Sequence, residues 1–194
     1  MRPRDTRGFT LIEMLVGLLV TGFIASAMAT LLVHNAKTNK AQQMFTDTQI
    51  NARGVMEIIV TRLRSAGWDP VNAGIDTVNP DPTPGDGVSQ LEILADLDED
   101  GLTASEDEAI LIRHVVDQVE WRRSPGAAFT IMASQISNDA NGDGIIEPMF
   151  QLDDPLDPAV VTVQVTARSS APDPRTGEFI RYTLRNEVAL RKEM

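Results

Sequence analysis

The hydrophobic pattern begins with a long apolar run near the N-terminus. From Phe9 to Val33 the only charged residue is Glu13, and from Met14 onward the run carries no charge at all. A helix of this length spans the roughly 30 Å of a bilayer core. Because lipid offers the backbone no hydrogen-bond partners, a helix is the expected state of this segment.

Behind this run the pattern becomes amphipathic. Between residues 34 and 66, apolar residues recur at spacings near three and four, and polar residues fill the other positions. The recurring apolar residues are Met44, Ile50, Val55, Ile58, Ile59 and Leu63. No proline interrupts the pattern, so we predict one helix from about Phe9 to Ser65, with Gly67 as its stop signal. The second half of this helix should lay an apolar stripe across a sheet.

The remainder of the chain carries strand patterns separated by turn-rich segments. Residues 71–88 concentrate proline and glycine and are predicted to be a loop. β-branched density and apolar–polar alternation predict strands at 90–95, 109–122, 129–136, 160–167 and 179–190. The first two strands should form a hairpin across an acidic loop, and the last two should pair antiparallel. The predicted fold class is α+β, with the long N-terminal helix packed on a C-terminal antiparallel sheet.

Composition narrows the function classes. The 194 residues fit one domain plus an anchor. A net charge of −11 disfavours general nucleic-acid binding. The chain has no cysteine and only two histidines, His34 and His114, which excludes thiolate and multi-histidine metal centres. We find no nucleophile elbow, phosphate loop or Ser/His/Asp arrangement, and therefore predict that the protein is not an enzyme.

The charges around the apolar run predict its orientation. Arg2, Arg4 and Arg7 precede it, with Asp5 as the only acid, so the short N-terminus should stay in the cytoplasm and everything after the run should be exported. No small-x-small cleavage site ends the run, as it would in an ordinary signal peptide. A carboxylate inside such a segment is costly and usually marks a partner, which draws attention to Glu13.

The residues Gly8-Phe9-Thr10-Leu11-Ile12-Glu13 resemble the class III signal of type IV pilins and type II secretion pseudopilins. The resemblance implies that prepilin peptidase cleaves between Gly8 and Phe9 and that the new amine of Phe9 is methylated. It also implies that Glu13 pairs with the terminal amine of a neighbouring subunit during assembly. A buried carboxylate and a buried ammonium are each expensive alone and tolerable together.

The same resemblance implies a division of the chain into four parts. These are a leader at 1–8, a transmembrane or filament-core half of the helix at 9–33, an amphipathic half at 34–66, and a β-rich globular domain at 67–194. The segment from Leu63 to Trp68 further resembles a junction of the PilW minor pilins, in which a helix ending in Leu-Arg is followed by Ala-Gly and an aromatic residue. An ordinary helix C-cap explains these residues equally well.

From this resemblance we expect the protein to be a minor pilin of a type IV pilus that helps pilus assembly or priming. It would start in the bacterial inner membrane, with its globular domain outside the cytoplasm, and then join the pilus. The implied partners are other pilins and minor pilins, prepilin peptidase, the inner-membrane assembly platform and, before assembly, membrane lipid. The alternatives are a minor pseudopilin of type II secretion, of the J type, or a membrane-anchored calcium-dependent adhesin.

Two acidic loops suggest calcium. In the first, carboxylates alternate and a glycine follows, as in the EF-hand loop. The ligands in that spacing are Asp96, Asp98, Asp100, the carbonyl of Leu102 and Asp107, with Glu106 or Glu108 as substitutes for the last. The second loop offers Asp139, Asn141, Asp143, the carbonyl of Ile145 and Glu147, but its twelfth position is Phe150. The competing interpretation is that Asp, Asn and Gly simply form polar turns between strands.

Overall fold

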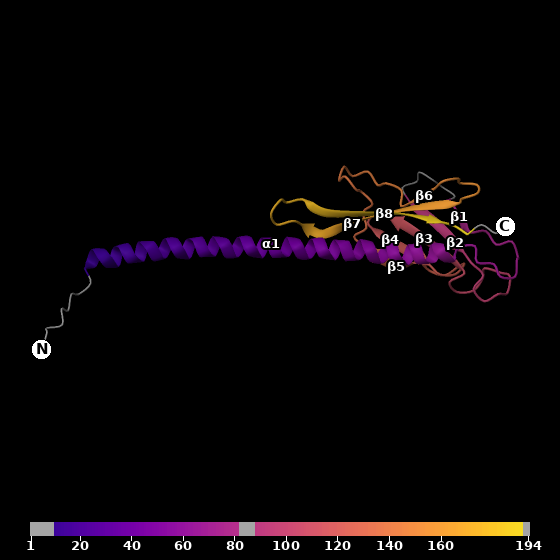
Figure 1. The fold of residues 1–194 in the computed structure, drawn as a ribbon, viewed down its shortest axis with the longest axis horizontal. Coiled ribbons are helices and arrows are strands. Elements are labelled where there is room, and N and C mark those ends of the chain that lie inside the picture. Colours follow the sequence, from indigo (N-terminus) through magenta and orange to yellow (C-terminus); the bar gives the residue numbers. More distant parts are fainter. Residues whose placement is uncertain (1–9, 82–87, 192–194) are drawn as a thin grey trace.

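A computed structural model describes residues 10–81 and 88–191. Helix α1, Leu11–Ser65, is continuous over its whole length, as predicted. It extends far beyond the rest of the molecule at its N-terminal end, and the β-strands pack only along its C-terminal half (Figure 1). The arrangement is the predicted α+β fold, a long apolar N-terminal helix followed by antiparallel sheets.

The helix ends at the glycine that the sequence indicated. Ala66 caps it by donating its N–H to the carbonyl of Leu63, and Gly67 follows with φ of 70°. A Cβ at Gly67 would lie 2.5 Å from Cγ2 of Thr77 and 3.2 Å from the carbonyl of Arg191. Only glycine fits both the left-handed conformation and this close approach.

Two antiparallel sheets follow the helix, where we had expected one. The first has the order β1-β2-β3-β4-β5, and the second the order β6-β7-β8. The strands of the first sheet are β1, Val78–Asn79; β2, Ser89–Leu94; β3, Ala109–Val115; β4, Gln118–Arg122; and β5, Thr130–Ser134. The strands of the second sheet are β6, Phe150–Leu152; β7, Val160–Pro172; and β8, Phe179–Ala189. The predicted hairpins β2–β3 and β7–β8 are both confirmed.

Three strand assignments differ from the prediction. The single strand predicted at 109–122 is the hairpin β3–β4, because the chain turns at Val116, whose φ is 59°. A β-branched residue is a rare choice for that conformation, so its strand propensity concealed the turn. Within the predicted loop at 71–88, β1 forms a short edge strand beside β2, and β6 was not predicted at all. Both are too short to show a period in the sequence.

The core joins one face of α1 with buried side chains of both sheets, including Leu91 and Ile112 of the first sheet. Val161, Val163 and Val165 of β7 are fully buried, as their alternation predicted. The buried face of the helix consists of Ala41, Met44, Thr48, Ala52, Val55, Met56, Ile59, Val60 and Leu63. Ile50 and Ile58, which we had placed on the same stripe, are 64% and 37% exposed. They lie away from this face at 3.6 residues per turn, so their assignment to the stripe was wrong.

The N-terminal half of α1 has no cover. Every large apolar side chain from Leu11 to Val33 is at least half exposed. Among the described residues, α1 is the one helix long and apolar enough to cross a membrane. So much exposed apolar surface requires another environment, either lipid or other helices.

One buried histidine makes the stability of the fold depend on pH. The side chain of His114 in β3 is fully buried, Nε2 lies 2.7 Å from the carbonyl oxygen of Ile136, and Nδ1 has no partner. Burial lowers the pKa of His114 below its ordinary value of 6.5, while the bond to Ile136 and the charge of Asp117 oppose this. The unfolded chain therefore binds this proton more tightly than the folded chain does, and stability is lost as the pH falls below about 6.5.

We expect the thermal midpoint of the purified full-length protein in detergent to decrease as the pH is lowered from 7.5 to 5. The His114→Gln variant should have a lower thermal midpoint at pH 7.5, because its free energy of unfolding falls by about 1–2 kcal/mol. Its midpoint should then decrease less than that of the native protein as the pH is lowered. The exposed His34 provides the control, because His34→Gln should leave the slope unchanged. An unaltered slope in His114→Gln would contradict the assignment.

Candidate functional site

The start of α1 places a carboxylate in an apolar environment. The backbone N–H and the hydroxyl of Thr10 both donate to Oε2 of Glu13, each at 2.8 Å. The N–H of Glu13 in turn donates to Oγ1 of Thr10 at 3.3 Å, which completes a capping box. Exposed Leu11, Ile12 and Met14 surround this pair. Within the described residues, the hydrogen bonds to the Glu13 carboxylate come from Thr10 of its own first turn, while Gly8 and Phe9 lie outside those residues.

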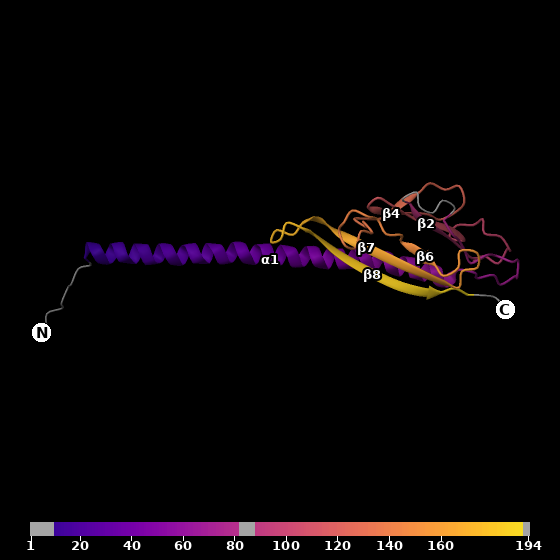
Figure 2. The same ribbon diagram turned by 90° about the horizontal axis from the view of Figure 1, so that it is seen from above.

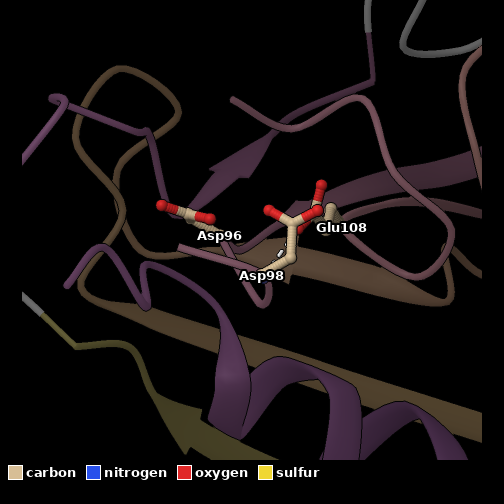
Figure 3. Close-up of side chains that lie close together, drawn as sticks. All are labelled: Asp96, Asp98 and Glu108. Carbon is tan, nitrogen blue, oxygen red and sulfur yellow. Dashed lines mark hydrogen bonds between the residues drawn. The ribbon is translucent and has the colours of Figure 1, made fainter. Parts of the chain in front are cut away.

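The first acidic loop brings three carboxylates together between β2 and β3 (Figure 3). One oxygen each from Asp96, Asp98 and Glu108 lies within 4.8 Å of the others. Asp96 and Glu108 are buried, and Asp98 is exposed. These are hard oxygen ligands of the kind that Ca²⁺ prefers.

Backbone N–H groups organise these three carboxylates. Asp96 accepts from the N–H groups of Asp100 and Gly101, at 3.2 and 3.0 Å. Glu108 accepts from Leu97 at 3.0 Å, from Asp98 at 3.1 Å and from Ser105 at 2.8 Å. The hydroxyl of Ser105 also donates to Asp98 at 2.8 Å, and this bond lowers the pKa of Asp98. The loop therefore orients its acidic side chains through its own backbone N–H groups.

Asp107 does not join this group, and its place is taken by Glu108, the substitute considered above. Arg123 donates to both oxygens of Asp107, at 2.7 and 2.6 Å, and Arg62 of α1 lies 3.4 Å away. The hydrogen bond from Arg123, followed by the charge of Arg62, lowers the pKa of Asp107. Because Asp107 has φ of 72°, the chain turns there, and the side chain of the next residue enters the loop.

The other residues of the first loop lie at its rim. Asp100 is exposed, and its carboxylate accepts from the N–H of Leu102 at 2.8 Å. Leu102 is itself 60% exposed. The close group of three carboxylates thus does not include that of Asp100.

The second acidic loop is closed by its own hydrogen bonds and by an arginine. Asp139 accepts from the N–H groups of Gly142 and Gly144, at 2.6 and 3.3 Å, and lies 3.8 Å from Arg181 of β8. The guanidinium packs on the loop so closely that a Cβ at Gly142 would lie 2.8 Å from it.

The remaining candidates of this loop bond to their near neighbours. Asn141 donates to Asp143 at 3.0 Å, and Asp143 accepts from the N–H of Ile145 at 2.7 Å. Glu147 accepts from the N–H of Ala140 at 2.9 Å. Within the described residues, the group of three mutually close carboxylates belongs to the first loop and not to this one.

A comparison with known families identifies the N-terminal segment. Residues 3–29 match the family model described as the prokaryotic N-terminal methylation motif. The chain begins with a type IV pilin-like signal. No curated protein and no solved structure matches the chain.

The pilin-like signal and α1 support one another. The matched residues contain Glu13 with its capping box and most of the exposed apolar half of the helix. Together they support membrane anchoring through the N-terminus and processing by prepilin peptidase. The motif indicates a type IV pilin or pseudopilin-type structural protein rather than an enzyme.

Two features of these sites escaped sequence reasoning, for different reasons. Thr10-x-x-Glu13 is the standard spacing of a capping box, so a local signal for it was present in the chain. The network of Arg62, Asp107 and Arg123 joins a helix, a loop and a strand end that are distant in sequence. No spacing rule brings those three residues together.

Proposed function

We propose that the protein is a minor pilin subunit of a type IV pilus that enters the assembly through α1 and helps to assemble or prime the pilus. The observation that carries the proposal is the uncovered apolar half of α1 directly behind a pilin-like signal. Lipid covers this surface before assembly, and the helices of neighbouring subunits cover it afterwards. Continuity of α1 into the packed half then ties the position of the domain to that of the filament core.

In this proposal the arginine-rich leader is cytoplasmic and the domain at 67–194 lies outside the cytoplasm. Prepilin peptidase removes residues 1–8, and the inner-membrane assembly platform receives the methylated subunit. The residues of the junction support the PilW type, since Leu63-Arg64, Ala66-Gly67 and the aromatic Trp68 match that sequence pattern. The alternative is a minor pseudopilin of type II secretion, and the leader does not separate the two classes.

The mature protein from its native host should begin at N-methylated Phe9. Mass spectrometry of the N-terminal peptide measures this directly, and inactivation of prepilin peptidase in the same host provides the control. In that strain the peptide should retain residues 1–8. Recovery of the intact chain from the unmodified host would refute the proposal.

Replacing Glu13 by Ala should leave membrane insertion intact but reduce incorporation by at least roughly tenfold. The reason is that an ammonium group left unpaired in an apolar filament core costs about 3–5 kcal/mol. The measurement is the amount of the subunit in sheared filaments relative to the membrane fraction. Glu57→Ala, at an exposed site on the same helix, is the matched control and should incorporate normally. Normal incorporation of the Glu13 variant would count against a pilin role.

The first acidic loop supports a second proposal, that Ca²⁺ binds between Asp96, Asp98 and Glu108. The observation in its favour is the 4.8 Å grouping of three carboxylate oxygens, two of them from buried residues. Their mutual repulsion would be offset by a divalent cation. In the second loop Arg181 already supplies a positive charge, so we propose calcium at the first loop alone.

Millimolar Ca²⁺ should raise the thermal midpoint of the full-length protein. At a free Ca²⁺ concentration of 100 times Kd, the free energy of unfolding should increase by about 2.7 kcal/mol. Asp98→Asn should abolish most of this shift, because it removes the exposed charged ligand. Asp143→Asn, in the second loop, is the control and should retain the shift. The absence of any shift with the native chain would end this second proposal.

A further inference from the structure

The second sheet ends at a long strand whose outer edge is open. β8 is the last strand in the order β6-β7-β8, and within residues 10–81 and 88–191 no strand pairs with its other side. Figure 2 shows β8 at the rim of the domain, with β7 on its inner side. An edge of this length presents a row of unpaired backbone donors and acceptors.

The hydrogen-bond pattern shows which backbone groups point outward. Gln164 of β7 donates to the carbonyl of Met149 at 2.8 Å, so the even-numbered residues of β7 bond toward β6. Leu190 donates to the carbonyl of Ala159 at 2.8 Å, so the odd-numbered residues of β7 bond toward β8. In the register of this pair, odd-numbered residues of β7 lie opposite even-numbered residues of β8, so the even-numbered residues of β8 bond toward β7. The N–H and C=O groups of the alternate residues therefore point away from β7, and these residues include Thr183, Arg185, Glu187 and Ala189.

The helix leaves this edge uncovered because it packs on a face of the sheet. One set of alternate side chains packs toward the core, namely Tyr182, Leu184 and Val188. The ring centroids of Tyr182 and of Phe45 in α1 lie 6.1 Å apart. The alternate side chains project from the other face, where those of Arg185 and Glu187 are 58% and 66% exposed. Backbone groups with these properties recognise an extended peptide by strand addition.

We propose that the outer edge of β8 pairs with an extended segment of a second, different subunit of the same assembly. This inference rests on the proposed function, because subunits that pack side by side through α1 bring such segments to a strand that runs beside the helix. The partner strand carries an acid opposite Arg185 and a base opposite Glu187, since opposite charges across a pair are favourable.

A second copy of this chain does not fit the edge as an antiparallel partner. β8 runs in the same direction as α1 (Figures 1 and 2). A symmetric antiparallel pair of β8 strands would therefore turn the two helices in opposite directions. Two chains anchored through the same helix end in one membrane cannot adopt that arrangement.

Photo-crosslinking in the native host tests the proposal with the full chain. A photoreactive amino acid at Ala189, which is exposed and lies on the outward set, should crosslink to another pilin-type subunit identified by mass spectrometry. Introducing Arg185→Pro in that chain should lower the yield about tenfold, because proline removes an outward N–H and leaves the bonds to β7 in place. Arg185→Ser is the matched control, because it keeps the N–H and should reduce the yield less.

A second proline variant keeps the test independent of any single substitution. Glu187→Pro removes the next outward N–H and should give the same loss, with Glu187→Ser as its control. The thermal midpoint of each purified variant separates loss of pairing from loss of folding. An unchanged yield in both proline variants, or crosslinks only between copies of this chain, would overturn the inference. The proposed function would survive that result if the mature chain still begins at Phe9 and Glu13→Ala still fails to incorporate.

Discussion

The packing of α1 against the valines of β7 is the contact on which the whole structure depends. Val161, Val163 and Val165 meet a helix face that includes Val55 and Ile59, and all of these side chains are fully or almost fully buried. Burial at this contact stabilises by about 25 cal/mol per Å² of apolar surface. It also fixes which half of the helix is covered by protein, and thereby leaves the other half to an outside environment.

The hydrophobic periods were sufficient to predict the large elements. The hydrophobic pattern of a helix as long as α1, or of a strand that alternates as β7 does, remains clear even where single residues depart from it. The turn at Val116 was not predicted because valine favours the extended conformation of a strand, whereas Val116 adopts a left-handed conformation. The assignment of Ile50 failed for another reason, since spacings near three and four also occur between residues on different faces.

The candidate sites were predictable only as far as their chemistry is local. The acidic loop was found from its composition, but the choice between Asp107 and Glu108 depended on a left-handed residue and on an arginine sixteen positions away in sequence. Sequence spacing places both residues near the loop and says nothing about which side chain turns inward. Arg123 pairs with both Glu106 and Asp107, and the side chain of Glu108 is the one that enters the loop.

The course of the β7–β8 hairpin beside α1 has a mechanical consequence. Both strands run along the helix, and β8 runs in the same direction as it does (Figure 2). Tension pulled through the helix reaches these strands lengthwise, as shear. Under shear the hydrogen bonds between the strands share the load and must break together, whereas a perpendicular pull would break them one at a time. The same layout that builds the core thus makes the domain resistant to a force along its own axis.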